Sequence, residues 1–560
     1  MPIKELFVSA LEALVSRIAS DDISRDELDD IHELLWSATT TRRSIKSFVA
    51  NARNALCRVN HLPPELLRLV FIECIRPTTL SCLIRQGQTW GCGWTHAHMR
   101  ASDVVALSHV CQRWREIILL TPHMWTSIRD IHAAETKTFL ERAQSLPLHV
   151  TLSKCPAWFL DVCEDRGALI RELHWSSPER YTVSKAPLDI NAPKVERLSL
   201  SKGPNGADYP DTIILKGATQ NMKMLSMNDI GWFPTNQFPA LTHLVISDSN
   251  LRAYKLRSFL ARCPNLTVLV IRSSSLGNTG APPAQLPATP YLRHLRKVSL
   301  HMRLVDLLSI LPINRAYATI ELTNDKFTIP RGFVNRLLAH PDYTQQPLST
   351  LYISDSSETE SGDWNSLMLT NGSGGICFKS TSGLSAQTAA LFARYGGLDN
   401  VTELWINGVD MVMFRLCIAV RPGLLNLRTL SVLHADHADS IPALSMLVQY
   451  VRVETKGIKA ALLAPPALRL VLSDGADLDA RQATREMLAL LGGAGAPLRW
   501  EKKDRRLILR APRFSPEYYT AVVPRLLARW ESVETEVGSG GDDALPVACA
   551  EDGFTAWEEE

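Results

Sequence analysis

Eleven short segments of this chain share one spacing of apolar residues, of the type apolar-x-x-Leu-x-Leu. Their central apolar residues are Leu173, Leu198, Leu225, Leu244, Leu269, Val298, Ile320, Leu351, Leu404, Leu430 and Leu470. These positions recur mostly at intervals of about 20 to 30 residues, with wider gaps after Leu351 and Leu430. Such a period is typical of a solenoid, in which each unit covers the apolar face of its neighbour.

Helical segments fit between these expected strands. The clearest runs from Tyr254 to Arg262, and Pro264 stops it because proline cannot continue a helix. Further helices are expected at Leu304–Leu311, Ala386–Tyr395, Met411–Val420 and Ala443–Val451. The sequence therefore predicts an α/β fold over residues 146–500, in which each strand leads into a returning helix.

A strand followed by a returning helix, repeated many times, resembles the leucine-rich repeat. Residues 241–251 and 266–276 fit the longer template of that family. Ser249 and Ser274 stand where family members usually carry Asn or Cys, whose side chain satisfies backbone groups in the turn. The resemblance implies an irregular leucine-rich-repeat-like α/β solenoid. An irregular α/β layer without a true horseshoe is the alternative.

Two segments nearer the N-terminus predict helices with apolar faces. Residues 62–67 read Leu-Pro-Pro-Glu-Leu-Leu. Proline suits the first helical position, and Glu65 complements the positive end of the helix dipole. The apolar residues that follow at helical spacing are Leu66, Leu67, Val70, Phe71, Cys74 and Ile75. A second helix is expected after a cap at Ser102 or Asp103, with one stripe formed by Leu107, Val110, Cys111, Trp114, Ile117 and Ile118.

Together these two segments closely resemble the F-box, the module that attaches a substrate receptor to the Skp adaptor of cullin–RING (SCF-type) ubiquitin ligases. F-boxes typically show Leu-Pro-x-Glu-Leu/Ile-Leu near their start and Val-Cys-Arg/Lys-x-Trp-Arg near their end. This chain departs at Gln112, where the basic residue usually stands, and in a loop of roughly 25 residues from Arg76 to about Ser102. Any helical hairpin shows similar apolar stripes, but the two signatures occur here together and in the family's order.

The resemblance implies an N-terminal helical F-box region, with the F-box at residues 58–130, that docks a Skp-type adaptor and through it a cullin. The adaptor-binding residues that it implies are Leu62, Pro63, Glu65, Leu66, Val70, Leu107, Val110, Cys111 and Trp114. The repeats would then bind a protein client, and the chain would be a substrate receptor without chemistry of its own. Two alternatives stay open: an interaction scaffold outside a ligase, and a repeat receptor that the helical pair merely caps.

The two ends of the chain complete the expected organisation. Residues 1–57 form an N-terminal helical region, packed beside the F-box or, alternatively, extended as a coiled-coil arm. Residues 497–532 are expected to form a hairpin, from 497–501 and 506–510, followed by a capping helix from about Pro516 to Trp530. Residues 531–560 contain ten Asp or Glu and no Lys or Arg, so a disordered acidic tail is expected over 533–560.

Composition indicates an ordinary globular protein of the cytoplasm or nucleus. The net charge is +2, and no apolar run approaches the roughly 18 residues that span a bilayer, so a membrane partner is not expected. The 11 cysteines are scattered without a Cys-x-x-Cys pair, which indicates reduced thiols. The basic cluster at residues 499–513 is explained by hairpin solvation, so nucleic acid is an unlikely partner.

No arrangement of residues predicts catalysis, a cofactor or a metal. Cys82, Cys92, His96 and His98 lack the paired spacing of a zinc knuckle. The glycine-rich runs at residues 372–375 and 492–495 lack the Gly-Lys-Ser/Thr end of a phosphate loop, so both are expected to be ordinary loops. No nucleophile motif such as Gly-x-Ser-x-Gly occurs. We therefore expect a non-catalytic interaction protein.

Overall fold

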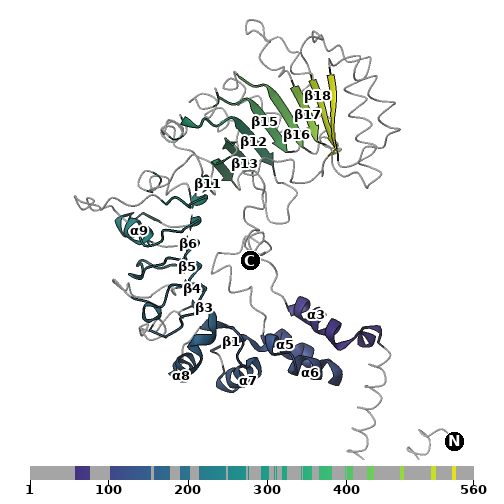
Figure 1. The fold of residues 1–560 in the computed structure, drawn as a ribbon, viewed down its shortest axis with the longest axis vertical. Coiled ribbons are helices and arrows are strands. Elements are labelled where there is room, and N and C mark those ends of the chain that lie inside the picture. The colour runs from purple at the N-terminus through teal and green to yellow at the C-terminus, as the bar shows by residue number, and fades with distance from the viewer. Residues whose placement is uncertain are drawn as a thin grey trace, which may run out of the picture. The chain divides into compact units, whose positions relative to one another are not determined.

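The computed structural model describes residues 57–75, 101–130, 132–152, 157–176, 189–201, 213–247, 250–251, 253–272, 275–276, 292–301, 308, 311, 318–324, 342, 345–355, 365–371, 373–380, 398, 400–407, 426–433, 467–471, 506–511 and 532–537. The chain forms two compact units, one from residues 1–76 with 99–125 and the other from residues 77–98 with 126–560. Their described parts contain helices in the first unit and a mixed α/β structure in the second (Figure 1).

In its described residues, the first unit contains three short α-helices and two 3₁₀ turns. They are η1 (Arg58–His61), α3 (Pro64–Ile75), α5 (Ala101–Ser108), α6 (Gln112–Leu119) and η2 (Pro122–Trp125). The helix expected to open at a proline does so, because α3 begins at Pro64. Its core contains Leu67, Phe71, Val104, Ile117, Ile118, Met124 and Trp125. These side chains lie on the facing sides of the helices and turns and pack against one another.

The second helix that the sequence predicted is in fact two. Backbone N–H groups of His109 and Val110 donate to carbonyls only three residues back, and Ser108 Oγ donates to the Val105 carbonyl at 2.7 Å. Cys111 is extended, with φ −155 and ψ 169, and caps α6 by accepting from the Trp114 N–H at 3.5 Å. The prediction of one continuous stripe was wrong because a local cap interrupted the helical period.

The second unit contains a 17-stranded, mostly parallel sheet. The strands are β1 (Ser127–Arg129), β2 (Leu148–Leu152), β3 (Ile170–Ser176), β4 (Arg197–Ser201), β5 (Met224–Asn228), β6 (His243–Ser247), β8 (Val268–Arg272), β10 (Lys297–His301), β11 (Thr319–Asn324), β12 (Thr350–Asp355), β13 (Asn365–Thr370), β14 (Gly375–Ser380), β15 (Glu403–Asn407), β16 (Thr429–Leu433), β17 (Ala467–Val471), β18 (Arg506–Ala511) and β19 (Ser532–Val537). Each of the eleven expected strand segments contributes a strand, so the α/β prediction is confirmed at this level.

The repeated leucine positions form the core on one face of the sheet. Cα partners align Leu198, Leu225, Leu244, Leu269 and Val298 in one row across five neighbouring strands. Every one of these side chains is 0% exposed, as are those two residues further along each strand. Because successive strand residues point to opposite faces, the residues between them lie on the other face, here called the polar face.

Short helices and turns connect the strands. α7 (Ala133–Ala143) follows β1, α8 (Ala157–Arg166) and η3 (Gly167–Leu169) follow β2, and η5 (Leu215–Gly217) precedes β5. α9 (Ala253–Leu260) confirms the clearest predicted helix. Its Phe259 ring stacks on Phe233 at 5.0 Å between centroids. β7 (Asn250–Leu251) and β9 (Ser275–Leu276) pair in parallel, in the two segments that fit the longer repeat template.

An antiparallel hairpin interrupts the repeat. β11 pairs with β14 rather than with the next strand in the chain, and β13 lies between β14 and β12. The chain thus passes beyond β11 by three strand positions, forms β12, and returns to fill the gap. Asn371 Oδ1 accepts the N–H groups of Ser373 and Gly374 at 2.9 Å in the hairpin turn. The glycine-rich run expected to be a loop is therefore this turn.

Three expectations about boundaries and register need correction. β1 starts the sheet at Ser127, inside the range 58–130 assigned to the F-box and before the expected start at 146. Leu430 pairs with Leu468 rather than with Leu470, so the eleventh segment is shifted by two residues. The register change preserves the side-chain alternation, since a shift of two residues keeps the same face in the core.

The C-terminal predictions change in the same way. β18 pairs in parallel with β17 on one edge and β19 on the other, which leaves no edge for the expected hairpin with 497–501. Residues 533–537, expected to begin a disordered tail, belong to β19. Their Val-Glu-Thr-Glu-Val alternation is a strand pattern that acidic composition obscured.

Several predictions lie outside the described residues. They are the N-terminal helical region up to residue 56, the loop at 76–100 with its Cys and His residues, the helices at 386–395, 411–420 and 443–451, most of the segment 304–311, Ser249 and Ser274, the capping helix at 516–530, and the tail beyond 537.

Candidate functional site

Helix α3 carries two apolar sectors, and one of them is exposed. Leu67 and Phe71, four residues apart, are 0% and 1% exposed and belong to the core. Leu66, Leu69 and Val70 lie on the adjoining sector and are 47%, 55% and 40% exposed. A short helix with an exposed apolar sector beside its buried one has a surface suited to another protein.

Helix α6 fixes the start of α3 through two hydrogen bonds. Arg113 Nη2 donates to the Leu62 carbonyl oxygen at 2.8 Å, and Trp114 Nε1 donates to Asn60 Oδ1 at 2.7 Å. The Trp114 ring also packs on Phe71, with ring centroids 4.6 Å apart. These contacts join segments more than 50 residues apart in the chain. The two signature segments identified in the sequence are therefore neighbours in the fold.

The same contacts bring exposed apolar residues to one end of the helical unit. Val110 is 53% exposed and lies directly before the capping Cys111. Arg113, one residue into α6, bonds to Leu62, which lies beside the exposed Pro63. Val110 lies just before the start of α6, and residues 62–66 span the start of α3. The Arg113–Leu62 hydrogen bond brings these two helix starts together.

The predicted site residues divide into exposed, half-buried and structural positions. Pro63, Glu65, Leu66, Val70 and Val110 are exposed. Leu62, Leu107, Cys111 and Trp114 are half-buried. Cys111 acts as a helix cap, and Trp114 joins α6 to α3, so these two side chains contribute to the shape of the site.

The structure adds apolar residues that sequence reasoning missed. Leu69, Val105, Leu119 and Leu120 are 55%, 39%, 38% and 82% exposed. Leu69 is three residues from Leu66, so helical spacing contained the signal for it. Nothing in the spacing distinguishes an exposed leucine from a buried one.

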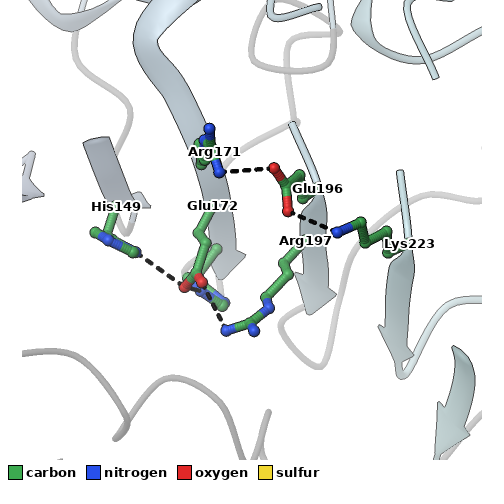
Figure 2. A network of polar contacts seen from close by, with 7 residues as sticks. His149, Arg171, Glu172, Glu196, Arg197 and Lys223 are labelled. Carbon is green, nitrogen blue, oxygen red and sulfur yellow. Dashed lines mark hydrogen bonds and ion pairs between the residues drawn. The ribbon is translucent and has the colours of Figure 1, made fainter. Parts of the chain in front are cut away.

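The polar face of the sheet carries a carboxylate network near its N-terminal end (Figure 2). Glu172 Oε1 accepts from Arg197 Nη1 at 2.8 Å, and Glu172 Oε2 lies 3.1 Å from His149 Nδ1 and 3.7 Å from His174 Nε2. A neighbouring network joins Glu196 to Arg171 at 2.9 Å and to Lys223 at 3.4 Å. Four adjacent strands, β2 to β5, are linked by these contacts.

Burial and pairing act in opposite directions on Glu172. Burial raises its pKa, but the contacts of the carboxylate with His149, His174 and Arg197 together outweigh burial. The pKa of Glu172 is therefore held well below its ordinary range, and the side chain stays ionised. This arrangement fixes strands and presents Arg197, whose side chain is 44% exposed, at the surface.

The described residues show neither a metal site nor a membrane-spanning helix. Among them, no three His, Cys, Asp or Glu side chains are grouped to hold a metal ion. None of the described helices has the length and apolar character needed to cross a bilayer.

Comparison with known proteins leaves the chain without an assigned family. No protein-family model matches it, and no curated protein matches it either. Function is therefore inferred from the residues and contacts described above.

Proposed function

We propose that this chain is the substrate-receptor subunit of an SCF-type (Skp–cullin–F-box) ubiquitin ligase. In this proposal the helical unit docks a Skp-type adaptor and the leucine-rich-repeat-like sheet binds a protein client. The bound client is then held close to a ubiquitin-loaded enzyme on the same assembly. The contribution to catalysis is proximity, and the chemistry belongs to other subunits.

One observation carries the proposal. The Leu-Pro-x-Glu and Val-Cys-x-x-Trp-Arg segments, which resemble the two signatures of the F-box, meet through the Arg113–Leu62 and Trp114–Asn60 hydrogen bonds. The apolar residues of those segments remain exposed where they meet, notably Leu66 and Val110. A hairpin that served only as a cap has no need of apolar side chains on its outer surface.

The energy gained by burying these side chains is similar in size to the cost of association. Burying four or five such side chains contributes on the order of 8–12 kcal/mol gross. Association costs about 4–15 kcal/mol, so net affinity depends on a few well-packed residues held in place beforehand. The α6–α3 hydrogen bonds supply that organisation, because they fix the exposed residues before the partner arrives.

The sheet supports the receptor half of the proposal. Parallel strands in continuous register place one row of polar-face residues after another along an extended surface. Repeat surfaces of this kind bind proteins through residues from several strands. Charged groups such as Arg197, which is 44% exposed, are available there.

Co-purification tests the adaptor half. The full chain is co-expressed with the Skp-type adaptor and a cullin, and compared with a Leu66→Ala/Val110→Ala variant. Leu120→Ala is the matched control, because Leu120 is 82% exposed on the same unit but lies outside both signature segments. We expect stoichiometric adaptor with the native chain and the control, and at least tenfold less with the double variant.

The outcomes separate the alternatives. Loss of adaptor from the double variant alone supports the F-box assignment. Adaptor without cullin favours a scaffold outside a ligase. If the native chain retains no adaptor, the ligase proposal is wrong, and an interaction protein of unknown partners remains.

A further inference from the structure

The polar face of the sheet contains three clusters built around one glutamate each. Glu172, Glu321 and Glu403 lie on β3, β11 and β15. Each carboxylate is approached by a cation from a neighbouring or next-neighbouring strand, namely Arg197, Lys297 and Arg469. A fully buried serine, Ser199, Ser299 or Ser431, lies on a strand within each cluster. Similar parts therefore recur at three places along the sheet.

In the middle cluster, the serine hydroxyl donates a hydrogen bond to the glutamate. Ser299 and Glu321 are direct partners across β10 and β11, and Ser299 Oγ donates to Glu321 Oε1 at 3.0 Å. Lys297 Nζ lies 3.9 Å from the other carboxylate oxygen. Both groups are buried, since Ser299 is 0% and Glu321 is 4% exposed. A buried hydroxyl and a half-buried lysine thus share one buried carboxylate.

In the third cluster, the buried serine has no glutamate as its direct cross-strand partner. Ser431 on β16 has Trp405 and Arg469 as its direct cross-strand partners, where Ser299 has Glu321. Trp405 is 4% and Ser431 is 0% exposed. Within the described part of the chain, neither Trp405 Nε1 nor Ser431 Oγ has a hydrogen-bond partner. Two adjacent buried donors without an acceptor are costly, and native proteins seldom retain them without a reason.

Arg469 lies across these donors. Its guanidinium carbon is 5.7 Å from the centroid of the Trp405 ring, and its Nη1 is 3.3 Å from Glu403 Oε1. Arg469 is on β17, and both of its partners, Trp405 and Glu403, are on β15. Because β16 lies between these two strands, the Arg469 side chain crosses over Ser431 on β16. Arg469 is a long side chain that is 24% exposed, and its contacts include a cation–π contact and an ion pair. Rotation about its side-chain torsions moves the guanidinium away from Ser431 without a change in the backbone.

We propose that Trp405, Ser431 and Arg469 form the anchoring site for an acidic side chain of the client. A carboxylate has two oxygen atoms and accepts several hydrogen bonds, so one oxygen takes the indole N–H and the serine hydroxyl while the other pairs with Arg469. The incoming acid takes the place that Glu321 occupies beside Ser299. This inference rests on the proposed function, because it assigns the chemistry of the client that the sheet binds.

Selection from a random peptide library tests the site. The purified complex of full chain and adaptor is the bait, and the probe is a displayed library of 12-residue peptides. We expect enrichment of Asp or Glu at one fixed position, and at least tenfold weaker binding of the best peptide after its acid is changed to the amide. Trp405→Phe/Ser431→Ala removes the two donors and keeps an aromatic ring under Arg469, so the acidic preference should disappear.

The matched control is a serine substitution on the polar face of a strand far from β15–β17. Ser226→Ala removes a serine hydroxyl from β5, where Ser226 is 6% exposed, and should leave the selected peptides unchanged. If the double variant does not fold, which its thermal unfolding shows, Ser431→Ala alone is expected to weaken the best peptide about tenfold. Absence of acidic enrichment, or enrichment that survives the double variant, would overturn the site.

Adaptor binding is measured on the same samples to keep the two proposals distinct. Retained adaptor together with no acidic preference removes the anchoring site and leaves the receptor function intact. An acidic preference in a chain that binds no adaptor removes the ligase and keeps the site.

Discussion

The helical unit and the sheet use the same kind of apolar periodicity for opposite purposes. In the sheet, the repeated positions such as Leu225 and Leu269 are completely buried. In α3, Leu66 and Leu69 recur at helical spacing and stay about half exposed, at 47% and 55%. A sheet shields both flanks of each leucine with neighbouring strands, whereas a single helix shields only one sector. Apolar spacing therefore identifies an element, and the number of its neighbours decides between core and surface.

The largest expected loss of stability follows from truncating a buried leucine of the sheet. Leu244→Ala removes a side chain that is 0% exposed between two paired strands, and should lower the free energy of unfolding by about 2–5 kcal/mol. Urea denaturation followed by far-UV circular dichroism measures the change. Leu66→Ala is the comparison, and should change stability by less than about 0.5 kcal/mol. Equal losses from the two variants would refute the contrast between the units.

A smaller effect is expected from the carboxylate on the polar face. Glu172→Gln leaves His149 and Arg197 without their anion and should cost about 1–3 kcal/mol at pH 7, less than a fully buried pair because Arg197 is partly exposed. Because folding lowers the pKa of Glu172, its contribution is complete above the ordinary value of 4.5 and declines as pH falls through the folded value. The difference between the denaturation midpoints of the two proteins should begin to shrink below about pH 4.5 and keep shrinking as the pH falls further. A gap that widens with acid would contradict this account.

The smallest expected loss of stability comes from a substitution inside the helical unit, and it tests whether that unit responds independently of the sheet. Trp114→Phe keeps a ring against Phe71 but removes the donor to Asn60, which is 9% exposed, and should cost about 1–2 kcal/mol locally. Hydrogen exchange should quicken in α3 and α6 and remain unchanged in β4 to β8. Faster exchange in the strands as well would show that the two units do not respond independently.

The strands were largely predictable because each contains its own apolar pair. Leu198 and Leu200, or Leu244 and Ile246, set both the face and the centre of a strand. β1 was missed because three residues, Ser127–Arg129, are too few to show a period. β13 and β14 do alternate, but their return into the gap beside β11 depends on pairing between distant segments, which local spacing does not determine.

The candidate site was predictable in identity rather than in arrangement. The two signatures named Leu66 and Val110, and the structure shows both exposed. The division of the second helix at Cys111, and the Arg113–Leu62 bond, arise from a cap and a long-range contact. Trp405 and Ser431 gave no signal at all, because only the register places them side by side.

The hairpin of β13 and β14 has a consequence for cooperativity. In a linear array of strands, each half influences the other only through the interface that joins them. Among the described strands, β1–β11 are connected in the sheet to β12 and β15–β19 solely through β13 and β14. Within the sheet, the two groups of strands therefore influence each other through one six-residue pairing on each side of this hairpin. Weakening that pairing would divide a single melting transition into two.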